Sequence, residues 1–229
     1  MFTLWGKFNK IINMATNREI FDGIAQQWYG FRHHTRFKRE LNDVADRWGE
    51  GKLLNVGCAH GPDFVPFKDR FELYGVDFSV EMLKMAVKYS QKYEFTASLA
   101  VADAQFLPFG DKTFNWAIGV ASYHHLDSKD KRQAAFIELH RVLKTGSEIF
   151  ITVWNKWQSR FWYRGKNIYV PWKTASGTLD RYYYLYDYFE IEMVMERAGF
   201  EVIKVFPEYS YKCPVKLFSQ NICVLARTL

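Results

Sequence analysis

Short apolar runs alternate with amphipathic stretches between Leu53 and Trp154. The runs lie at residues 53–56, 73–77, 99–102 and 116–120. Apolar runs of this length are typical of buried parallel strands, and the helical spacing between them predicts helices that cover the sheet. Strands that alternate with helices imply right-handed crossovers, so the pattern predicts an α/β fold with a mostly parallel sheet.

The N-terminal part of the chain is predicted to be a helical cap. Residues 17–31 place apolar side chains at helical spacing, as in a helix that covers a pocket. The first fourteen residues are expected to form an amphipathic helix on the body of the protein. Lys7 and Lys10 interrupt their apolar positions, which argues against a signal peptide or a membrane span. We therefore expect residues 1–48 to cap a single domain over 1–229.

The C-terminal part contains a predicted helix and two predicted strands. The helix covers residues 187–199, and the strands begin at Glu201 and Asn221 and are expected to pair antiparallel at the sheet edge. Before them, residues 155–186 show no simple period. This segment therefore predicts a long loop, or several, that lies over the sheet edge and binds the substrate.

A turn with two glycines follows the first strand, in the run VGCAHG. Gly57 and Gly61 can adopt positive φ, so a ligand could lie against the bare backbone beside the N–H groups of the next helix. The spacing G-x-A-x-G differs from the G-x-G-x-x-G of dinucleotide binders. Asp77 ends the second strand, where an acidic residue can accept hydrogen bonds from both hydroxyls of a ribose.

The ends of the third and fourth strands complete the predicted site. Asp103 and Ala104 follow the third strand, and Val120 ends the fourth, with His124 and His125 just past the edge. Ligands of open α/β sheets bind where the strand ends converge. One histidine is expected to be structural and the other to contact substrate. A metal site is not expected, because further ligands with an ordered spacing are missing from the sequence.

Composition indicates which cellular compartment and which charge of partner to expect. The chain has 31 Lys and Arg against 25 Asp and Glu, a net charge of +6, which suits an anionic partner without requiring one. Cys58, Cys213 and Cys223 form no C-x-x-C pair, which argues against a disulfide framework and a zinc site. The simplest expectation is a protein of the reducing cytoplasm.

Aromatic and basic side chains are concentrated in residues 155–186. The segment contains six Lys or Arg, ten aromatic residues and one acidic residue. Aromatic residues interleaved with cations can stack on unpaired bases and pair with phosphates. The alternative is an aromatic lid over a small hydrophobic substrate.

The order VGCAHG, GVD, VADA and FNWAIGV resembles the motif series of class I S-adenosylmethionine-dependent methyltransferases over roughly residues 50–155. The resemblance implies a Rossmann-like, seven-stranded sheet with an antiparallel C-terminal hairpin, and S-adenosylmethionine as cofactor. The implied cofactor-binding residues are Asn55, Gly57, Ala59, Gly61, Asp77, Phe78, Asp103, Ala104 and Val120. Asn55 replaces an acidic residue and cannot pair with the cofactor's ammonium as an anion. Ala59 replaces a glycine and adds a methyl where the backbone approaches the cofactor.

Further motifs resemble the tRNA wobble-uridine carboxymethyl methyltransferases, which esterify the carboxylate of a 5-carboxymethyluridine in the anticodon. These motifs are IAQQWYGFRH, YHHLDSKDKR, VPWK and RYYYLY, and the similarity spans roughly residues 18–227. The resemblance implies tRNA as the partner and catalytic roles for Arg32, His124, His125, Arg181 and Tyr182. One position departs from the family, because Tyr184 stands where a histidine is expected.

The resemblance also implies a protein partner. Residues 96–102 predict an apolar, uncharged edge strand without a protective residue, and such a strand invites a partner that adds its own strand. In the resembled family this partner is a small zinc-binding activator protein.

Two other functions stay open at this point. One is a small-molecule methyltransferase for a quinone-type or lipid precursor, with the aromatic segment as its lid. The other is a cofactor-binding RNA module or activator-dependent scaffold without catalysis, suggested by Asn55 and Ala59.

Overall fold

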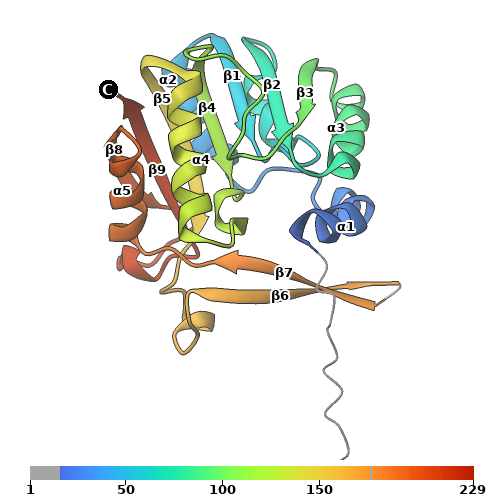
Figure 1. The fold of residues 1–229 in the computed structure, drawn as a ribbon, viewed down its shortest axis with the longest axis vertical. Helices are drawn as coiled ribbons and strands as arrows, with labels where there is room; N and C mark the ends of the chain where they lie inside the picture. The colour runs from blue at the N-terminus through green and yellow to red at the C-terminus, as the bar shows by residue number, and fades with distance from the viewer. Residues whose placement is uncertain (1–15, 176) are drawn as a thin grey trace, which may run out of the picture.

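Seven strands form the central sheet, in the order β3-β2-β1-β4-β5-β9-β8 (Figure 1). The strands are β1 (Gly51–Val56), β2 (Phe71–Asp77), β3 (Ala97–Val101), β4 (Phe114–Val120), β5 (Leu143–Trp154), β8 (Phe200–Pro207) and β9 (Asn221–Thr228). Strands β1 to β5 are parallel, and β9 is antiparallel to both β5 and β8. This computed structural model, which describes residues 16–175 and 177–229, confirms the predicted α/β class and the antiparallel C-terminal pair. The helix expected over the first fourteen residues lies outside the described residues.

Helices cover both faces of the sheet (Figure 1). They are α1 (Asn17–Phe31), α2 (Lys38–Trp48), α3 (Val80–Lys92), α4 (Lys129–Val142) and α5 (Tyr188–Arg197). Neighbouring residues of β1 point to opposite sides, so that Leu54 packs in the core with α4 and α5, whereas Leu53 packs in the core with α2. This alternation explains why β1 reads as a continuous apolar run, because both of its faces are buried. No helix of the described residues is long and apolar enough to cross a membrane.

Serine side chains cap two of the helices that cover the sheet. The side chain of Ser79 caps α3 by accepting the Met82 N–H, and that of Ser128 caps α4 by accepting the Lys131 N–H. Helix α4 ends at Val142, because the next residue already belongs to β5 and pairs with the start of β4.

Residues 155–186 contain a hairpin rather than the expected long loops, so that prediction is wrong. Strands β6 (Asn167–Thr174) and β7 (Gly177–Tyr184) pair antiparallel and lie across the carboxyl ends of the parallel strands (Figure 1). The period of two was not visible in the sequence because aromatic side chains occupy both faces of β7. Short 3-10 helices complete the described fold: η1 (Pro62–Phe67), η2 (Tyr123–His125), η3 (Ser159–Phe161) and η4 (Lys216–Phe218).

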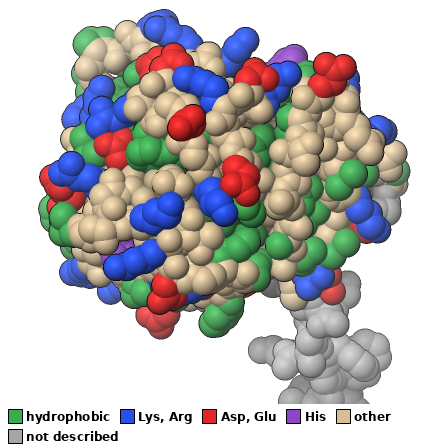
Figure 2. Space-filling view, turned by 90° about the horizontal axis from the view of Figure 1, so that it is seen from above, with side chains coloured by type: hydrophobic (Ala, Val, Ile, Leu, Met, Phe, Trp, Pro, Cys, Tyr) green, Lys and Arg blue, Asp and Glu red, His purple; other side chains and the backbone are tan. Residues whose placement is uncertain are grey.

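Charged side chains are mixed on the end of the molecule away from the hairpin. Figure 2 looks down on this end and shows acidic and basic groups interspersed. The surplus of positive charge is therefore not gathered on that face.

Candidate functional site

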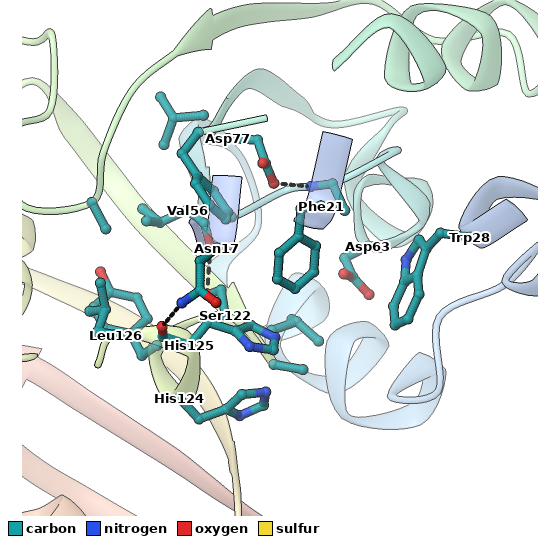
Figure 3. Close-up of a pocket in the computed structure, with 18 of the residues that line it drawn as sticks. Asn17, Phe21, Trp28, Val56, Asp63, Asp77, Ser122, His124, His125 and Leu126 are labelled. Atoms are coloured by element: carbon teal, nitrogen blue, oxygen red, sulfur yellow. Dashed lines mark hydrogen bonds between the residues drawn. The ribbon is translucent and has the colours of Figure 1, made fainter. Parts of the chain in front are cut away.

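A cavity of about 440 Å³ lies at the carboxyl ends of β1, β2, β3 and β4. Helix α1 and the β7 residue Tyr183 also contribute to its walls. Figure 3 shows Phe21 of α1 facing the ring of His125, with Asp63 and Trp28 beyond it. The cavity is therefore at the sheet edge where the sequence predicted a ligand site.

The turn after β1 brings bare backbone to the cavity wall. Gly57 has φ +73°, and a Cβ built on it would lie 2.4 Å from the Cβ of Ser122, so only glycine fits. Ala59 also adopts a left-handed conformation, with φ +47°. Its N–H donates to Asp77 Oδ2 at 2.8 Å, and its methyl packs with the apolar cluster of α1 that contains Phe21. The turn thus accommodates the departure at Ala59.

Asp77 connects this turn to the start of α3. One carboxylate oxygen accepts the Ala59 N–H and the other accepts the Ser79 N–H at 2.9 Å. The side chain is buried, and burial raises the pKa of Asp77 to about 6. Each oxygen keeps a second lone pair, so the carboxylate can also accept from two neighbouring hydroxyls of a ligand.

The other predicted cofactor residues divide into two groups. Cavity-lining residues are Gly57, Ala59, Asp77, Phe78, Asp103, Ala104 and Val120. Asn55 and Gly61 are not part of the wall. Asn55 is fully buried inside β1, and its amide nitrogen and oxygen have no hydrogen-bond partner among the described residues. Gly61, at φ +89°, shapes the turn ahead of η1.

The histidine pair lines the cavity, and the two rings differ in which nitrogen carries the proton. Nδ1 of His124 accepts the backbone N–H of Trp154 at 3.2 Å, which leaves the proton on Nε2. Nδ1 of His125 lies 2.8 Å from the carbonyl oxygen of Tyr182 and must donate, which makes its Nε2 an acceptor. Burial lowers the pKa of His125 to about 4 and that of His124 well below its usual value. Both rings are therefore neutral at physiological pH.

Arg32 lies at the end of α1 and lines the cavity. Its guanidinium carbon is 5.2 Å from the ring centre of Trp28 and 5.7 Å from that of Phe31. The backbone carbonyl of Arg32 accepts a short hydrogen bond from His60, which fixes the point where the chain leaves the helix. No described carboxylate forms an ion pair with this guanidinium.

Arg181 is buried next to the cavity but is not one of its lining residues, and it forms no ion pair with a described carboxylate. Its guanidinium carbon lies 4.8 Å from the ring centre of Trp172 and 5.4 Å from those of Trp28 and Tyr183. Only 6% of the residue is exposed, and its Nε has no hydrogen-bond partner among the described residues. A buried cation without a carboxylate is costly, so an anionic ligand would relieve it.

Tyr182 does not present its side chain to the cavity, whereas Tyr183 does. The Tyr182 hydroxyl donates to Asn167 and to the carbonyl of Asp127, and its ring belongs to the main core. The Tyr183 ring lines the cavity and lies 5.0 Å from that of His124 and 4.4 Å from that of His125. The sequence did not indicate Tyr183, because the segment was predicted to be a loop, in which side chains do not alternate between two faces.

Asp63 is a second wall residue that the sequence analysis did not single out. It lies at the start of η1, is 9% exposed and makes no ion pair with another described residue. Burial raises its pKa to about 6. Figure 3 shows its carboxylate on the same side of the cavity as Trp28.

The comparisons with known proteins agree with this fold and site. The structure resembles a solved S-adenosylmethionine-dependent methyltransferase of Clostridium acetobutylicum with a TM-score of 0.70 and 15% identity, over 91% of this chain and 96% of the other. A family model described as a methyltransferase domain matches residues 53–146, which include all four strand ends at the cavity. The chain is thus an S-adenosylmethionine-dependent methyltransferase with the class I fold.

Two relatives match this methyltransferase over different shares of their own length. It is 27% identical over 238 residues to an uncharacterized protein of Methanocaldococcus jannaschii, an alignment that covers 92% of this chain and 90% of the relative. It is also 29% identical over 167 residues to a tRNA (carboxymethyluridine(34)-5-O)-methyltransferase of Xenopus tropicalis, which covers 70% of this chain and 25% of that enzyme. The methyltransferase thus spans about a quarter of the length of this second relative.

The cavity of the methyltransferase fits S-adenosylmethionine. At Gly57 there is no space for a side chain, so bare backbone is exposed to a ligand. Asp77 offers two acceptors for ribose hydroxyls. Asp103 accepts from the backbone and side-chain nitrogens of Gln105, so its carboxylate is held at the rim next to Ala104. A carboxylate at this place can accept from an exocyclic amine such as that of adenine.

Proposed function

We propose that this methyltransferase esterifies the carboxylate of a 5-carboxymethyl-type wobble uridine in a tRNA anticodon. The observation that carries the proposal is the pair Arg32 and Arg181, both without a carboxylate partner among the described residues. Their guanidinium carbons lie 5.2 and 5.4 Å from the ring centre of the same tryptophan, Trp28. Arg32 lines the cavity, and Arg181 lies behind its wall against Trp28 and Tyr183. Two cations held among aromatic rings in this way suit a planar anion such as a carboxylate.

The residues around the cavity suit the chemistry of ester formation. Bound S-adenosylmethionine supplies an electrophilic methyl group on its sulfonium sulfur. A carboxylate is already anionic at neutral pH, so its oxygen can form the new O–CH₃ bond, while the S–CH₃ bond breaks, without loss of a proton. The protein must orient the carboxylate and remove its water shell. Arg32 does this as a fork of donors, with the His124 Nε2–H as a neutral donor that does not quench the nucleophile.

Aromatic walls support a nucleobase as the group that carries the carboxylate. Phe21, Trp28 and Tyr183 line the cavity beside the histidines. Flat aromatic side chains stack on unpaired bases, which is how proteins commonly recognise single-stranded RNA. The similarity to the Xenopus tRNA (carboxymethyluridine(34)-5-O)-methyltransferase also supports a nucleobase substrate.

Nucleoside analysis tests this function directly. Mass spectrometry of tRNA from a deletion strain should show loss of a wobble-uridine methyl ester and accumulation of its free acid. The purified protein should restore the ester with S-adenosylmethionine in vitro. An unchanged set of wobble nucleosides in the deletion strain would refute the proposal.

A small-molecule acceptor is the second candidate, because the same aromatic walls could cover a quinone-type or lipid precursor. The two functions differ in their response to salt and ribonuclease. Activity on tRNA should fall steeply as salt rises, since phosphate contacts release counter-ions, and ribonuclease should remove it. Activity that neither treatment changes would favour the small molecule.

Asp63 is the residue that we assign to the ammonium group of the cofactor. It supplies near the β1 turn the negative charge that the neutral, buried Asn55 cannot offer. A carboxylate whose pKa is raised on folding destabilises the protein once it ionises, because the folded state holds the proton more tightly than the unfolded state. We expect a protein to keep a destabilising carboxylate of this kind where a bound cation offsets its cost.

The Asp63→Asn variant should therefore be more stable than the wild type without cofactor at pH 7.5. The expected gain is about 2 kcal/mol, or roughly 5 °C in melting temperature, because the buried charge is gone. The gain should vanish below about pH 3, where Asp63 is protonated in both the folded and the unfolded state. Thermal unfolding at both pH values, with Asp69→Asn on the surface as control, checks this. An equal loss of stability at both pH values would contradict it.

A protein partner that adds a strand is proposed for the free edge of β3. Among the described strands β3 pairs only with β2, and Val101 at its end is 49% exposed. Such an edge can accept a strand from another chain, and the partner we propose is a small zinc-binding activator.

Co-expression with this activator should raise the soluble yield of the methyltransferase several-fold, because the unpaired edge would be covered. Gel filtration and the yield of soluble protein provide the measurement. A Val101→Lys variant should lose the complex but gain solubility alone. A monodisperse, fully active isolated chain would count against this partner.

A further inference from the structure

A second hollow, of about 310 Å³, has a lining of its own. It lies between the segment that follows β5 and the loop before β9, and we call it the flanking groove. Its lining residues are Gln158, Ser159, Arg160, Tyr211, Phe218 and Gln220. All six are polar, cationic or aromatic.

Residues that line the flanking groove contact residues that line the cofactor cavity. The guanidinium carbon of Arg160 lies 4.6 Å from the ring centre of Trp154, and Trp154 lines the cavity. Arg36 also lines the cavity, and its Nη2 donates to Gln220 Oε1 at 3.4 Å. A flexible chain with one unit in the cavity could therefore place the neighbouring unit in the groove.

Aromatic rings are exposed at the flanking groove. Phe218 is 38% exposed, and the ring of Trp162, itself 47% exposed, packs against it at a centroid distance of 5.5 Å. Tyr211 contributes a third ring, held in place because its hydroxyl donates to the carbonyl of Val215. Exposed rings beside a binding cavity are suited to stacking on a flat ligand.

The polar groups of the groove favour an anion and a hydrogen-bonding edge. Nε of Arg160 donates to Gln158 Oε1 at 2.7 Å, which orients the guanidinium and leaves its Nη groups without a partner among the described residues. The amide nitrogen of Gln220 likewise makes no hydrogen bond with a described residue. The lining contains no acidic side chain. A phosphate could therefore pair with Arg160 while a base edge meets Gln220.

We infer that the flanking groove binds the nucleotide next to the methylated one in a single strand of RNA. Its base stacks on Phe218, and its phosphate pairs with Arg160. This inference rests on the proposed function and deepens it, because it assigns part of the RNA recognition to residues outside the methyl-transfer site. Stacking of one base contributes about tenfold or more to affinity.

A double-mutant cycle between protein and RNA tests the inference. The probe is a fluorescent single-stranded RNA heptamer of anticodon-loop sequence, with the target uridine at its centre, and fluorescence anisotropy measures its affinity. Removing the base on one side of the target should weaken binding to the wild type about tenfold. Phe218→Ala should weaken binding of the intact heptamer by a similar factor and show no further loss with the abasic RNA. Losses that multiply, or an abasic RNA that binds the wild type normally, would overturn the inference.

Arg160→Gln provides a second readout. Loss of one phosphate contact should reduce the salt slope of RNA affinity by about one, whereas Arg197→Gln on α5, the matched control, should leave it unchanged. An equal slope for wild type and Arg160→Gln would overturn the phosphate contact. Failure of the proposed function would look different, because the wild type itself would bind the heptamer without methylating a 5-carboxymethyluridine in it.

Discussion

Replacing Arg32 with alanine should abolish methyl transfer to a carboxylate while S-adenosylmethionine still binds normally. Arg32 lines the cavity but forms no ion pair with a described carboxylate, and Asp77 is held by the N–H groups of Ala59 and Ser79 instead. Loss of a charged, bidentate partner in a poorly solvated site costs about 3–4 kcal/mol, which corresponds to roughly three orders of magnitude in kcat/KM.

Isothermal titration of the cofactor and single-turnover rates on a 5-carboxymethyluridine RNA measure the two effects separately. Arg32→Lys keeps the charge but loses the planar fork, so its rate should lie between those of wild type and Arg32→Ala. Arg197→Ala on α5 controls for the loss of a surface arginine. Normal turnover by Arg32→Ala would refute the role assigned to this residue.

Replacing Asp77 with alanine should have the opposite pattern, with loss of cofactor affinity as the primary defect. The substitution removes the acceptors for ribose hydroxyls and also leaves the Ala59 and Ser79 N–H groups without their partner. Two lost hydrogen bonds to a charged group amount to about 3 kcal/mol, so the dissociation constant for S-adenosylmethionine should rise about 100-fold.

Calorimetry with S-adenosylmethionine and S-adenosylhomocysteine measures this change. Asp69→Ala, on the exposed turn before β2, is the matched control and should bind normally. Circular dichroism checks that the variant is folded, which we expect because the buried charge of Asp77 is itself unfavourable at neutral pH. An Asp77→Ala protein that binds cofactor with wild-type affinity would contradict the assigned role.

The strand ends that form the cavity could be predicted because two local rules were sufficient. Apolar runs identified the strands, and the carboxyl ends of parallel strands always meet at one edge. The structure brings to one cavity the residues at or just after the ends of these runs, which are Asp77, Asp103, Val120 and the histidine pair. Arg32, predicted from a resemblance to a family, also lies in this wall.

The aromatic segment shows where such rules were insufficient. In RYYYLY both faces of β7 are buried, one against the core and one against α1 and the histidines, so the sequence carried no sign of which tyrosine faces the ligand. Tyr183 lines the cavity, and Tyr182 orients His125 through its carbonyl oxygen instead of its side chain. Pairing with β6 decided this arrangement, and a strand pair is a contact between distant positions.

By itself the sequence determined the α/β class, the strands that end near the cofactor and the turn that exposes Gly57, because local periodicity and backbone conformation are encoded by neighbouring residues. Only the tertiary structure decided which charges lack partners. The sequence does not reveal that Arg181, Asp63 and the amide of Asn55 are buried. Burial makes each of them costly, and that cost arises from segments that fold over them from elsewhere in the chain.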